Sequence, residues 1–557
     1  MKKETITHKR VIFFGLALSI LFTALVMRLL YIQLIMGGHY KQKAHSQGIL
    51  PIVVKHARGD ILDRNGIVLT RGRLKAYLLI FPAYFNDRNS LYDIVGPMTG
   101  LGLDELSDSV LGGSPFIKCE ILNPDPKIER SIRQGEYPGL MIDYETQRYD
   151  DFTLARHLMG YFKKSDNAPQ SGIEKEYDAF LRSDDVLTVY AMTDAKRRIL
   201  SGTVHRNKSK NDEYYDIGLT IDYYVQSALE RAMDSHAQKA GGVVVEVETG
   251  DILAIASRPN FDQNDIETAK NHKDSLWAVP VKAFSPGSLF KIIVATAGIE
   301  NGICNGETMH ICQGGITINS VRYSCHSERG GLGDISMRQA FAHSCNDAFI
   351  GIASRVGGDS IIKMAQKMGL GQPLDIGIHN ERGSLPQKVE YAGAGIGNLA
   401  LGQGKVEVTP IQIAQMMSII ASDGIKKDLS LIREITDQSG YRVENIYEEQ
   451  TGERLIKSGT ARELRAWMGD VTEYGTGIKA YSVKAGGTAG KTGTPQIFGD
   501  ADAGYYGWFA GFFPTDTPKY AIVILVREES SGGEKAALIF RDTADEITRY
   551  TEKLRIP

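Results

Sequence analysis

A serine and a lysine lie three residues apart in the segment 285–291, Ser-Pro-Gly-Ser-Leu-Phe-Lys. Pro286 and Gly287 favour a helix start just before the pair, which would place Ser288 and Lys291 on one face, one turn apart. A serine hydroxyl becomes a good nucleophile when a neighbouring base removes its proton, and a partly buried lysine can be that base. The pair indicates nucleophilic catalysis, although Ser-x-x-Lys alone also occurs by chance in a chain of 557 residues.

Two downstream segments carry further groups that such a reaction needs. Ser344 and Asn346 follow a helix-like stretch, and Lys491-Thr492-Gly493-Thr494 follows a glycine-rich segment at 485–490. In this order, Ser-x-x-Lys, Ser-x-Asn and Lys-Thr-Gly are the motif set of penicillin-recognising serine acyltransferases. The ordered set is far more specific than any of its parts, so we interpret the three motifs as one active site.

On these residues the chain resembles the penicillin-binding proteins, and the resemblance covers nearly its whole length. The segments 220–226, 402–412 and 506–512 resemble the catalytic domain of that family. The run 57–66, Ala-Arg-Gly-Asp-Ile-Leu-Asp-Arg-Asn-Gly, resembles the pedestal of its high-molecular-mass members. The bifunctional class A members carry a glycosyltransferase domain with its own acidic motif, which we do not find. The resemblance therefore implies a class B, transpeptidase-only enzyme.

The resemblance implies a catalytic role for four residues. Ser288 would attack the carbonyl of the penultimate D-alanine of a peptidoglycan stem peptide, and Lys291 would take the hydroxyl proton. Ser344 would relay a proton toward the leaving amine, with the positive charge of Lys491 nearby. We expect this chemistry to require no cofactor.

The resemblance also implies a substrate-binding group. Asn346 would hydrogen-bond the substrate backbone, and Thr492, Gly493 and Thr494 would form an edge strand that the substrate extends, with the threonine hydroxyls holding its carboxylate. The backbone N–H groups of Ser288 and Thr494 would form the oxyanion hole, in which one donor typically contributes about 3–4 kcal/mol. Glycine fits a strand that something must approach closely.

The fate of the acyl-enzyme decides the activity. An amine from a second stem peptide would form a cross-link, which makes a D,D-transpeptidase the first expectation. Water as acceptor would give a D,D-carboxypeptidase, and acylation without turnover would give a β-lactam sensor. A β-lactamase is disfavoured because those enzymes are much smaller and lack an anchor and pedestal. In each remaining case β-lactam antibiotics would acylate Ser288.

The region from about 216 onward has an α+β pattern. Apolar spacing predicts a helix over 222–237 and a closing helix over about 535–554. A Thr-Gly-Asp turn at 249–251 predicts a hairpin within 242–256. Three more strands are expected at 491–494, 505–513 and 519–527. Together these elements predict a five-stranded antiparallel sheet covered by the first and last helices, with Ser288 in an all-helical lobe, as in the serine β-lactamase-like fold.

The N-terminus carries an apolar stretch over 11–36, interrupted only by Arg28. A membrane-spanning helix needs about 20 apolar residues, which this stretch supplies if the arginine reaches the interface. Lys2, Lys3, Lys9 and Arg10 precede the span, which favours a cytoplasmic N-terminus. We expect a single-pass anchor in a bacterial membrane, with the catalytic domain outside.

These features predict four parts of the chain: a cytoplasmic tail at 1–10, the anchor at 11–36, an elongated pedestal at 37–215 and the transpeptidase domain at 216–557. A formal net charge of −3 and the lack of a basic stripe give no reason to expect nucleic acid as a partner. Expected partners are peptidoglycan stem peptides, β-lactams, the membrane, and glycosyltransferase or scaffold proteins of the cell-wall machinery.

Four of the five cysteines crowd near the motifs. Cys312 and Cys325 flank a plausible hairpin, and His326 follows directly. Three interpretations are open: a Cys312–Cys325 disulfide, buried thiols, or a structural zinc site formed by Cys312, Cys325 and His326. The candidates for a fourth zinc ligand are Cys304, His310 and Cys345. Cys119, far upstream, is expected to be a buried thiol.

Overall fold

The computed structural model describes residues 2–38, 40, 49–70, 72, 74–81, 85, 88–102, 104, 117–163, 168–192, 205–207, 214–271, 274–325, 330–446, 451–497, 504–528 and 533–554. The chain forms two compact units, the first from 1–57, 74–146 and 183–213, and the second from 58–73, 147–182 and 214–557. Two segments of the predicted pedestal therefore belong to the second unit, and the boundary at 215/216 stays a prediction.

The first unit begins with the apolar helix α1 (Lys2–Leu30), which continues into the π-helical turn η1 (Tyr31–Ile35). Among the described residues, Arg10–Ile35 is the one helical stretch long and apolar enough to cross a membrane. Its 26 residues exceed the roughly 20 that a bilayer requires. The structure thus agrees with the predicted helical span, and its orientation stays a prediction.

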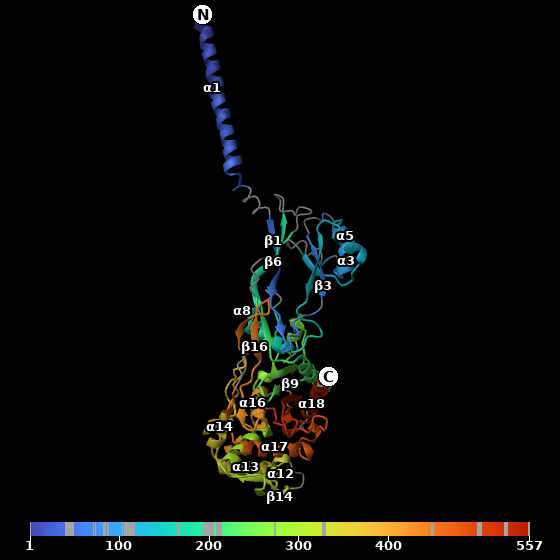
Figure 1. Cartoon of the computed structure of the whole chain (residues 1–557), viewed down its shortest axis with the longest axis vertical. Helices are drawn as coiled ribbons and strands as arrows, with labels where there is room; N and C mark the ends of the chain where they lie inside the picture. The colour runs from blue at the N-terminus through green and yellow to red at the C-terminus, as the bar shows by residue number, and fades with distance from the viewer. Residues whose placement is uncertain are drawn as a thin grey trace. The chain divides into compact units, whose positions relative to one another are not determined.

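The rest of the first unit contains two small sheets. One has the order β1 (Ile49–Arg58), β6 (Arg182–Met192), β7 (His205–Asn207), and the other places β3 (Leu74–Ile80) between β4 (Ile117–Glu120) and β5 (Leu140–Thr146). Helices α3 (Arg88–Thr99) and α5 (Pro126–Arg133) accompany the second sheet, and its core includes Leu78, Ile80 and Ile132. Figure 1 shows β3, α3 and α5 in blue and cyan.

The second unit is built on the predicted five-stranded sheet. Its order is β10 (Ile252–Arg258), β9 (Ala240–Glu246), β21 (Tyr520–Glu528), β20 (Tyr505–Phe513), β19 (Ala489–Gly493), and every neighbouring pair is antiparallel. Because side chains alternate along a strand, each strand supplies two cores. Val244 and Ile524 pack with α9 (Tyr223–His236) and α18 (Glu534–Leu554), whereas Val243 and Val523 pack with the helical lobe. The predicted sheet and its covering helices are confirmed.

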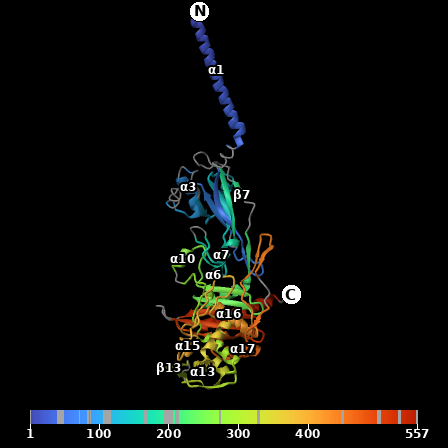
Figure 2. The same cartoon turned by 90° about the vertical axis from the view of Figure 1, so that its left-hand side faces the viewer.

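The helical lobe lies on the other face of the sheet (Figure 2). Its central helix α16 (Pro410–Ala421) is buried at every position, as expected for a helix that is apolar all round. A capping box between Thr409 and Gln412 fixes its start. Around it lie α11 (Lys291–Glu300), α12 (Met337–Ala342), α13 (Asn346–Val356), α14 (Gly358–Lys367), α15 (Gly395–Ala400) and α17 (Ser458–Glu473).

The segment 57–66 lies at a buried charge cluster of the second unit. Arg58 Nε lies 2.7 Å from Glu174 Oε2, and Arg148 also pairs with this fully buried glutamate. Because an unpaired buried carboxylate is costly, the two arginines stabilise Glu174. Beside it runs the sheet β17 (Arg442–Asn445), β16 (Ile432–Thr436), β8 (Asp216–Leu219), β2 (Ile61–Leu62).

The remaining short elements of the second unit connect these layers. They are α6 (Arg156–Met159), α7 (Gly172–Glu176), α8 (Asp178–Leu181), α10 (Ile266–Lys270), η3 (Val279–Val281), β15 (Ile425–Lys426), β18 (Glu453–Arg454) and η5 (Ile478–Ala480).

Candidate active site

Ser288 lies where the chain enters the helical lobe. The predicted helix start is realised in two steps, a 3-10 turn η4 (Gly287–Phe290) followed directly by α11. Gly287 has φ +53°, and a Cβ there would lie 2.8 Å from Pro495 Cδ, so glycine is required by both conformation and space. Ser288 is half-buried, and its hydroxyl makes no hydrogen bond to any described residue. It is therefore free to meet a substrate.

Three hydrogen bonds fix this segment from two other elements. Trp508 Nε1 on β20 donates to Ser285 O at 2.9 Å. The carbonyl of Gly402 accepts from the backbone N–H of Gly287 at 3.2 Å and from Ser285 Oγ at 3.0 Å. A Cβ at 402 would lie 2.3 Å from Gly287 O. The segments 402–412 and 506–512, singled out in the sequence, thus position the segment that carries Ser288, the predicted nucleophile.

Lys291 is fully buried at the start of α11, one turn from Ser288. Its Nζ donates to Ser344 O at 2.6 Å, to Ser344 Oγ at 3.1 Å and to Asn346 Oδ1 at 2.7 Å. Burial lowers the pKa of Lys291 to about 7, against a smaller raising influence of the Cys345 and Cys325 thiols. An amine with this pKa is about half neutral at pH 7, and its neutral form keeps two N–H donors and gains the lone pair that a general base needs.

Ser344 lies in the short link between α12 and α13 with φ +55°. A non-glycine residue in this left-handed region costs about 1–2 kcal/mol. Its N–H donates to Phe341 O at 3.1 Å, and both its carbonyl and its hydroxyl accept from Lys291. The strained conformation therefore brings two oxygens of one residue to the same amine. Such strain is characteristic of functional sites.

Lys491 lies on β19, the last strand of the sheet among the described strands. It is fully buried, and its Nζ donates to Thr492 O at 3.2 Å. Burial, reinforced by the like charge of Lys291, lowers the pKa of Lys491. The structure thus brings Lys291, Ser344 and Asn346 into direct contact. Lys491 is close enough for its charge to interact with that of Lys291.

The Lys-Thr-Gly strand is packed against the serine segment. A Cβ on Gly493 would lie 2.6 Å from Pro286 O and 3.2 Å from Leu289 Cγ. We expected glycine here for close approach of substrate, and the structure adds another reason: the backbone just before Ser288 comes this close. Thr492 is buried and its Oγ1 shares a 2.8 Å hydrogen bond with Thr476 Oγ1. Contacts of Thr492, Gly493 and Thr494 with substrate stay predictions.

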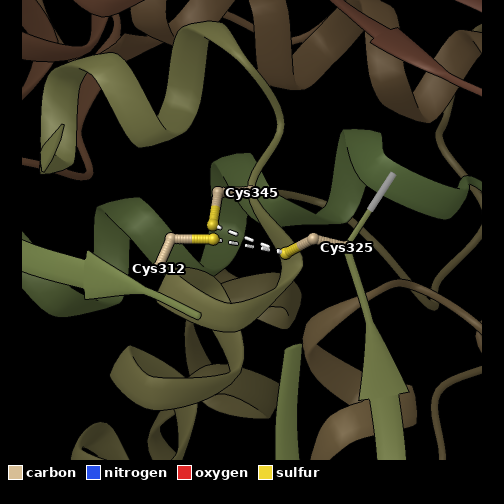
Figure 3. Close-up of side chains that lie close together, drawn as sticks. All are labelled: Cys312, Cys325 and Cys345. Carbon is tan, nitrogen blue, oxygen red and sulfur yellow. Dashed lines mark hydrogen bonds between the residues drawn. The ribbon is translucent and has the colours of Figure 1, made fainter. Parts of the chain in front are cut away.

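Cys312, Cys325 and Cys345, here called the thiol cluster, converge beside the Ser-x-Asn motif (Figure 3). Cys325 Sγ lies 3.8 Å from Cys312 Sγ and 3.7 Å from Cys345 Sγ, and all three sulfurs lie within 4.8 Å of one another. Two short sheets carry the loop, β11 (Met309–Cys312) with β14 (Gly333–Ser336), and β12 (Gly315–Ile318) with β13 (Val321–Ser324). Residues far apart in the sequence thus form one sulfur site.

Hydrogen bonds within the thiol cluster shift the pKa values of its cysteines in opposite directions. Its hydrogen bond with Cys345, helped by the N–H of Asp347 and the thiol of Cys312, lowers the pKa of Cys325 to about 5. The hydrogen bond with Cys325 and burial raise the pKa of Cys345. The sulfurs of Cys312 and Cys345 both point at Cys325, so hydrogen bonds from both thiols would stabilise a thiolate at this position.

The other predicted ligands have different outcomes. His326 lies outside the described residues. Cys304 is buried and does not belong to the thiol cluster, and burial raises its pKa to about 11. His310 Nε2 lies 3.3 Å from Asp347 Oδ1, also outside the cluster. Cys119 is half-buried on β4, and all five cysteines are free.

The thiol cluster contacts the catalytic motif through the backbone. Cys345 is the middle residue of Ser344-Cys345-Asn346, and Asn346 Nδ2 donates to Ser324 O at 2.8 Å, the residue before Cys325. The N–H of Asp347 donates to Cys325 Sγ at 3.3 Å. The loop that carries Cys325 therefore orients the asparagine that accepts from Lys291.

Two contacts that position site residues were not predicted from the sequence, those of Ser324 O and of the Thr476 hydroxyl. The carbonyl of Ser324 has no sequence signal, because any residue supplies a carbonyl. Thr476 lies in the run Gly475-Thr-Gly477, and the paired glycines could have indicated a tight functional turn. Both contacts join segments that are distant in the sequence.

Comparisons with known proteins agree with this architecture. Residues 240–545 match the family described as "Penicillin binding protein transpeptidase domain", and residues 53–214 match "Penicillin-binding Protein dimerisation domain". Penicillin-binding protein PbpB of Mycolicibacterium smegmatis is 30% identical over 450 residues, covering 75% of this chain and 67% of that protein. The probable peptidoglycan D,D-transpeptidase PenA of Neisseria meningitidis is 25% identical, covering 96% and 90%.

A solved structure shares the fold. The crystal structure of penicillin-binding protein 3 from Mycobacterium tuberculosis, complexed with aztreonam, superposes with a TM-score of 0.63 at 22% identity, covering 90% of this chain and 97% of that one. With the dimerisation and transpeptidase regions both matched, the chain belongs to the penicillin-binding proteins, in the two-domain class B arrangement.

Proposed function

We propose that this chain is a peptidoglycan D,D-transpeptidase that cross-links stem peptides and is acylated by β-lactams. The observation that carries the proposal is the environment of Lys291: a buried amine with a pKa lowered to about 7, hydrogen-bonded to Ser344 and Asn346, one turn from Ser288. The matched transpeptidase family and the similarity to PenA, a probable peptidoglycan D,D-transpeptidase, support this activity.

In the acylation step, Ser288 Oγ attacks the carbonyl carbon of the penultimate D-alanine and Lys291 Nζ takes its proton. The new C–O bond forms an ester, the C–N bond to the terminal D-alanine breaks, and Ser344 Oγ passes a proton to the leaving amine. The N–H groups of Ser288 and Thr494 donate to the developing oxyanion. One such donor contributes about 3–4 kcal/mol to barrier lowering.

In the second step the amine of a neighbouring stem peptide attacks the ester. Its N–C bond forms the cross-link, its proton returns through the Ser344 and Lys291 pair, and Ser288 leaves as the free hydroxyl. Lys491 stabilises negative charge as it develops in both steps. We place the reaction outside the cell membrane, with Arg10–Ile35 as the anchor, a pedestal at 37–215, a catalytic domain at 216–557 and cell-wall synthesis proteins as partners.

The test uses the full chain in detergent with a fluorescent penicillin. Wild type should be labelled, with the mass increment on the peptide containing Ser288, and Ser288→Ala should not be labelled. Ser235→Ala, on the exposed surface of α9, is the matched control and should label normally. Persistent labelling of Ser288→Ala would show that the nucleophile is another residue.

A donor stem peptide and an acceptor amine separate the two turnover outcomes. We expect a cross-linked product whose yield rises with acceptor concentration. Free acid as the sole product at every acceptor concentration would identify a D,D-carboxypeptidase, and a stable acyl-enzyme without either product would identify a sensor.

We further propose that the thiol cluster holds a structural zinc ion. Tetrahedral Zn–S bonds of about 2.3 Å require sulfur separations of about 3.8 Å, and two observed separations are 3.8 and 3.7 Å. Cys312, Cys325 and Cys345 would be ligands, and His326 remains the candidate for the fourth position. Zinc bound here would stabilise the loop that positions Asn346, without entering the reaction.

Metal analysis of protein purified without chelator tests this site. About one zinc per chain is expected, and none in Cys325→Ser, while Cys304→Ser, outside the cluster, should keep it. Metal-free wild type in which Cys312, Cys325 and Cys345 react as free thiols, or form a disulfide in the peptide map, would contradict the zinc proposal.

A further inference from the structure

Thr476 lies in the turn between α17 and η5 and joins two of the catalytic motifs. Its N–H donates to Ala342 O at 3.1 Å, at the end of the helix that leads to Ser344. Its hydroxyl lies 2.8 Å from Thr492 Oγ1 on β19. One residue therefore contacts both the helix before Ser-x-Asn and the threonine of Lys-Thr-Gly.

The turn is built so that only residue 476 can present a side chain here. A Cβ at Gly475 would lie 2.4 Å from Ala342 O, and one at Gly477 would lie 3.0 Å from Phe509 Cε2. Glycine at both positions lets the backbone approach α12 on one side and β20 on the other. Between them Thr476 is exposed, whereas Thr492 is buried.

The turn is also fixed from behind. The N–H groups of Gly475 and Gly477 donate to Asp470 O and Val471 O at 3.0 and 2.9 Å. The Asp470 carboxylate accepts from Arg338 on α12 and from Tyr474 Oη. Helices α12 and α17 thus hold the Thr476 hydroxyl at a set position relative to Thr492.

Counting protons shows what a hydroxyl pair can do. Each threonine hydroxyl has one proton and accepts through its lone pairs. One proton of the pair forms the mutual hydrogen bond, and the other proton is left for an external acceptor. A carboxylate only accepts, so it suits this remaining donor, and the mutual bond limits the directions in which that donor can point.

We propose that Thr476 is a positioning residue for the terminal carboxylate of the substrate, acting by orienting the hydroxyl of Thr492. The inference rests on the proposed function, in which Thr492 meets that carboxylate. It assigns to the 474–477 turn a part in recognising anionic substrates, distinct from the chemistry at Ser288 and Lys291.

The experiment compares two probes in the full chain: a penicillin with its free carboxylate and the same penicillin as its methyl ester. In Thr476→Val, which keeps the shape and loses the hydroxyl, acylation by the acid should slow about fivefold, as expected for the loss of a neutral hydrogen bond that orients the Thr492 hydroxyl. The loss should appear in the concentration for half-maximal rate. Acylation by the ester should change less than twofold.

Two variants control the result. Thr476→Ser keeps the hydroxyl and should restore acid acylation, and Thr548→Val, on α18 with a hydroxyl bonded only within its own helix, should leave both probes unchanged. Equal losses for acid and ester, or no loss for the acid, would overturn the inference. Failure of wild type to be acylated at Ser288 would instead overturn the proposed function.

Discussion

Two sides of the candidate active site are held in place in different ways. On one side, β19 is a fully paired neighbour of β20, with a continuous register from Ala489↔Phe512 to Gly493↔Trp508, and its five residues are all buried. On the other side, the described strands within 309–336 form two separate two-stranded sheets, and Met309 and Ile311 on β11 are about two thirds exposed. Few side chains are buried on this side, so the sulfur contacts of the thiol cluster provide part of its stabilisation.

The β19 side of the site is therefore expected to be rigid, and the side that carries the thiol cluster is expected to open more easily. Segments with few buried contacts open at lower free-energy cost than core strands. Lys291 interacts with both sides: its positive charge contributes to lowering the pKa of Lys491 on β19, and its acceptors Ser344 and Asn346 adjoin Cys345 and the segment that carries Cys325. We call the β19 side the core side and the side with the thiol cluster the thiol side. We expect substitutions on the core side to lower the acylation rate strongly, and substitutions on the thiol side to lower it less.

The largest effect should come from the amine that both sides share. Lys291→Ala removes the proposed general base, whose contribution is typically 10²–10⁴-fold, so penicillin acylation should slow about a thousandfold. Stopped-flow or gel labelling rates measure this loss. Lys282→Ala, at a half-exposed lysine paired with Glu381, should stay within about twofold of wild type. A Lys291→Ala rate within tenfold of wild type would remove Lys291 from the mechanism.

A second effect follows from the pKa of Lys291. In the proposed mechanism the neutral amine is the active form, and a pKa of about 7 means that this form is lost as the pH falls below 7. The acylation rate should rise with pH, level off above about 8 and be about thirtyfold lower at pH 5.5. A pH–rate profile in mixed buffers measures it. An acylation rate that stays the same between pH 5.5 and pH 8.5 would contradict the assignment of neutral Lys291 as the general base.

The core side can be perturbed by one methyl group. Gly493→Ala places a Cβ 2.6 Å from Pro286 O, and such overpacking typically costs about 1–3 kcal/mol. We expect acylation to slow about tenfold and the melting temperature to fall. Gly459→Ala, a helical glycine with open space around it, is the matched control and should keep both values. Unchanged acylation in Gly493→Ala would mean that the contact with the serine segment is dispensable.

The smallest rate effect is expected on the thiol side. Cys325→Ser should slow acylation about threefold while lowering thermal stability, because the loop that orients Asn346 loosens. A chelator should lower the melting temperature of wild type and leave that of Cys325→Ser unchanged, since the proposed ion is already lost. Equal chelator sensitivity in both proteins would place the effect elsewhere. A larger loss of acylation rate in Cys325→Ser than in Lys291→Ala would contradict the expectation that the thiol side contributes less.

The sequence predicted the fold of the second unit well because its signals are local. The hairpin around 249–251, the late strands and the closing helix follow from turn residues and apolar spacing, and all are found near the expected positions. The two compact units were less accessible. Residues 58–73 and 147–182 join the second unit through tertiary contacts such as the Arg433 side chain with Arg64 O and the N–H of Ala155 with Glu230 Oε1, which no local sequence pattern predicts.

By itself the sequence determined the family, the ordered motifs and the apolar anchor, because these depend on residue identity and spacing along the chain. The tertiary structure decided how the motifs meet: it brought Ser344 and Asn346 to Lys291 and set Thr476 against Thr492. It also selected Cys345, from the three candidates Cys304, His310 and Cys345, as the residue that joins Cys312 and Cys325. These contacts join residues 16 to 55 positions apart, and their geometry is fixed by the packing of whole helices and strands.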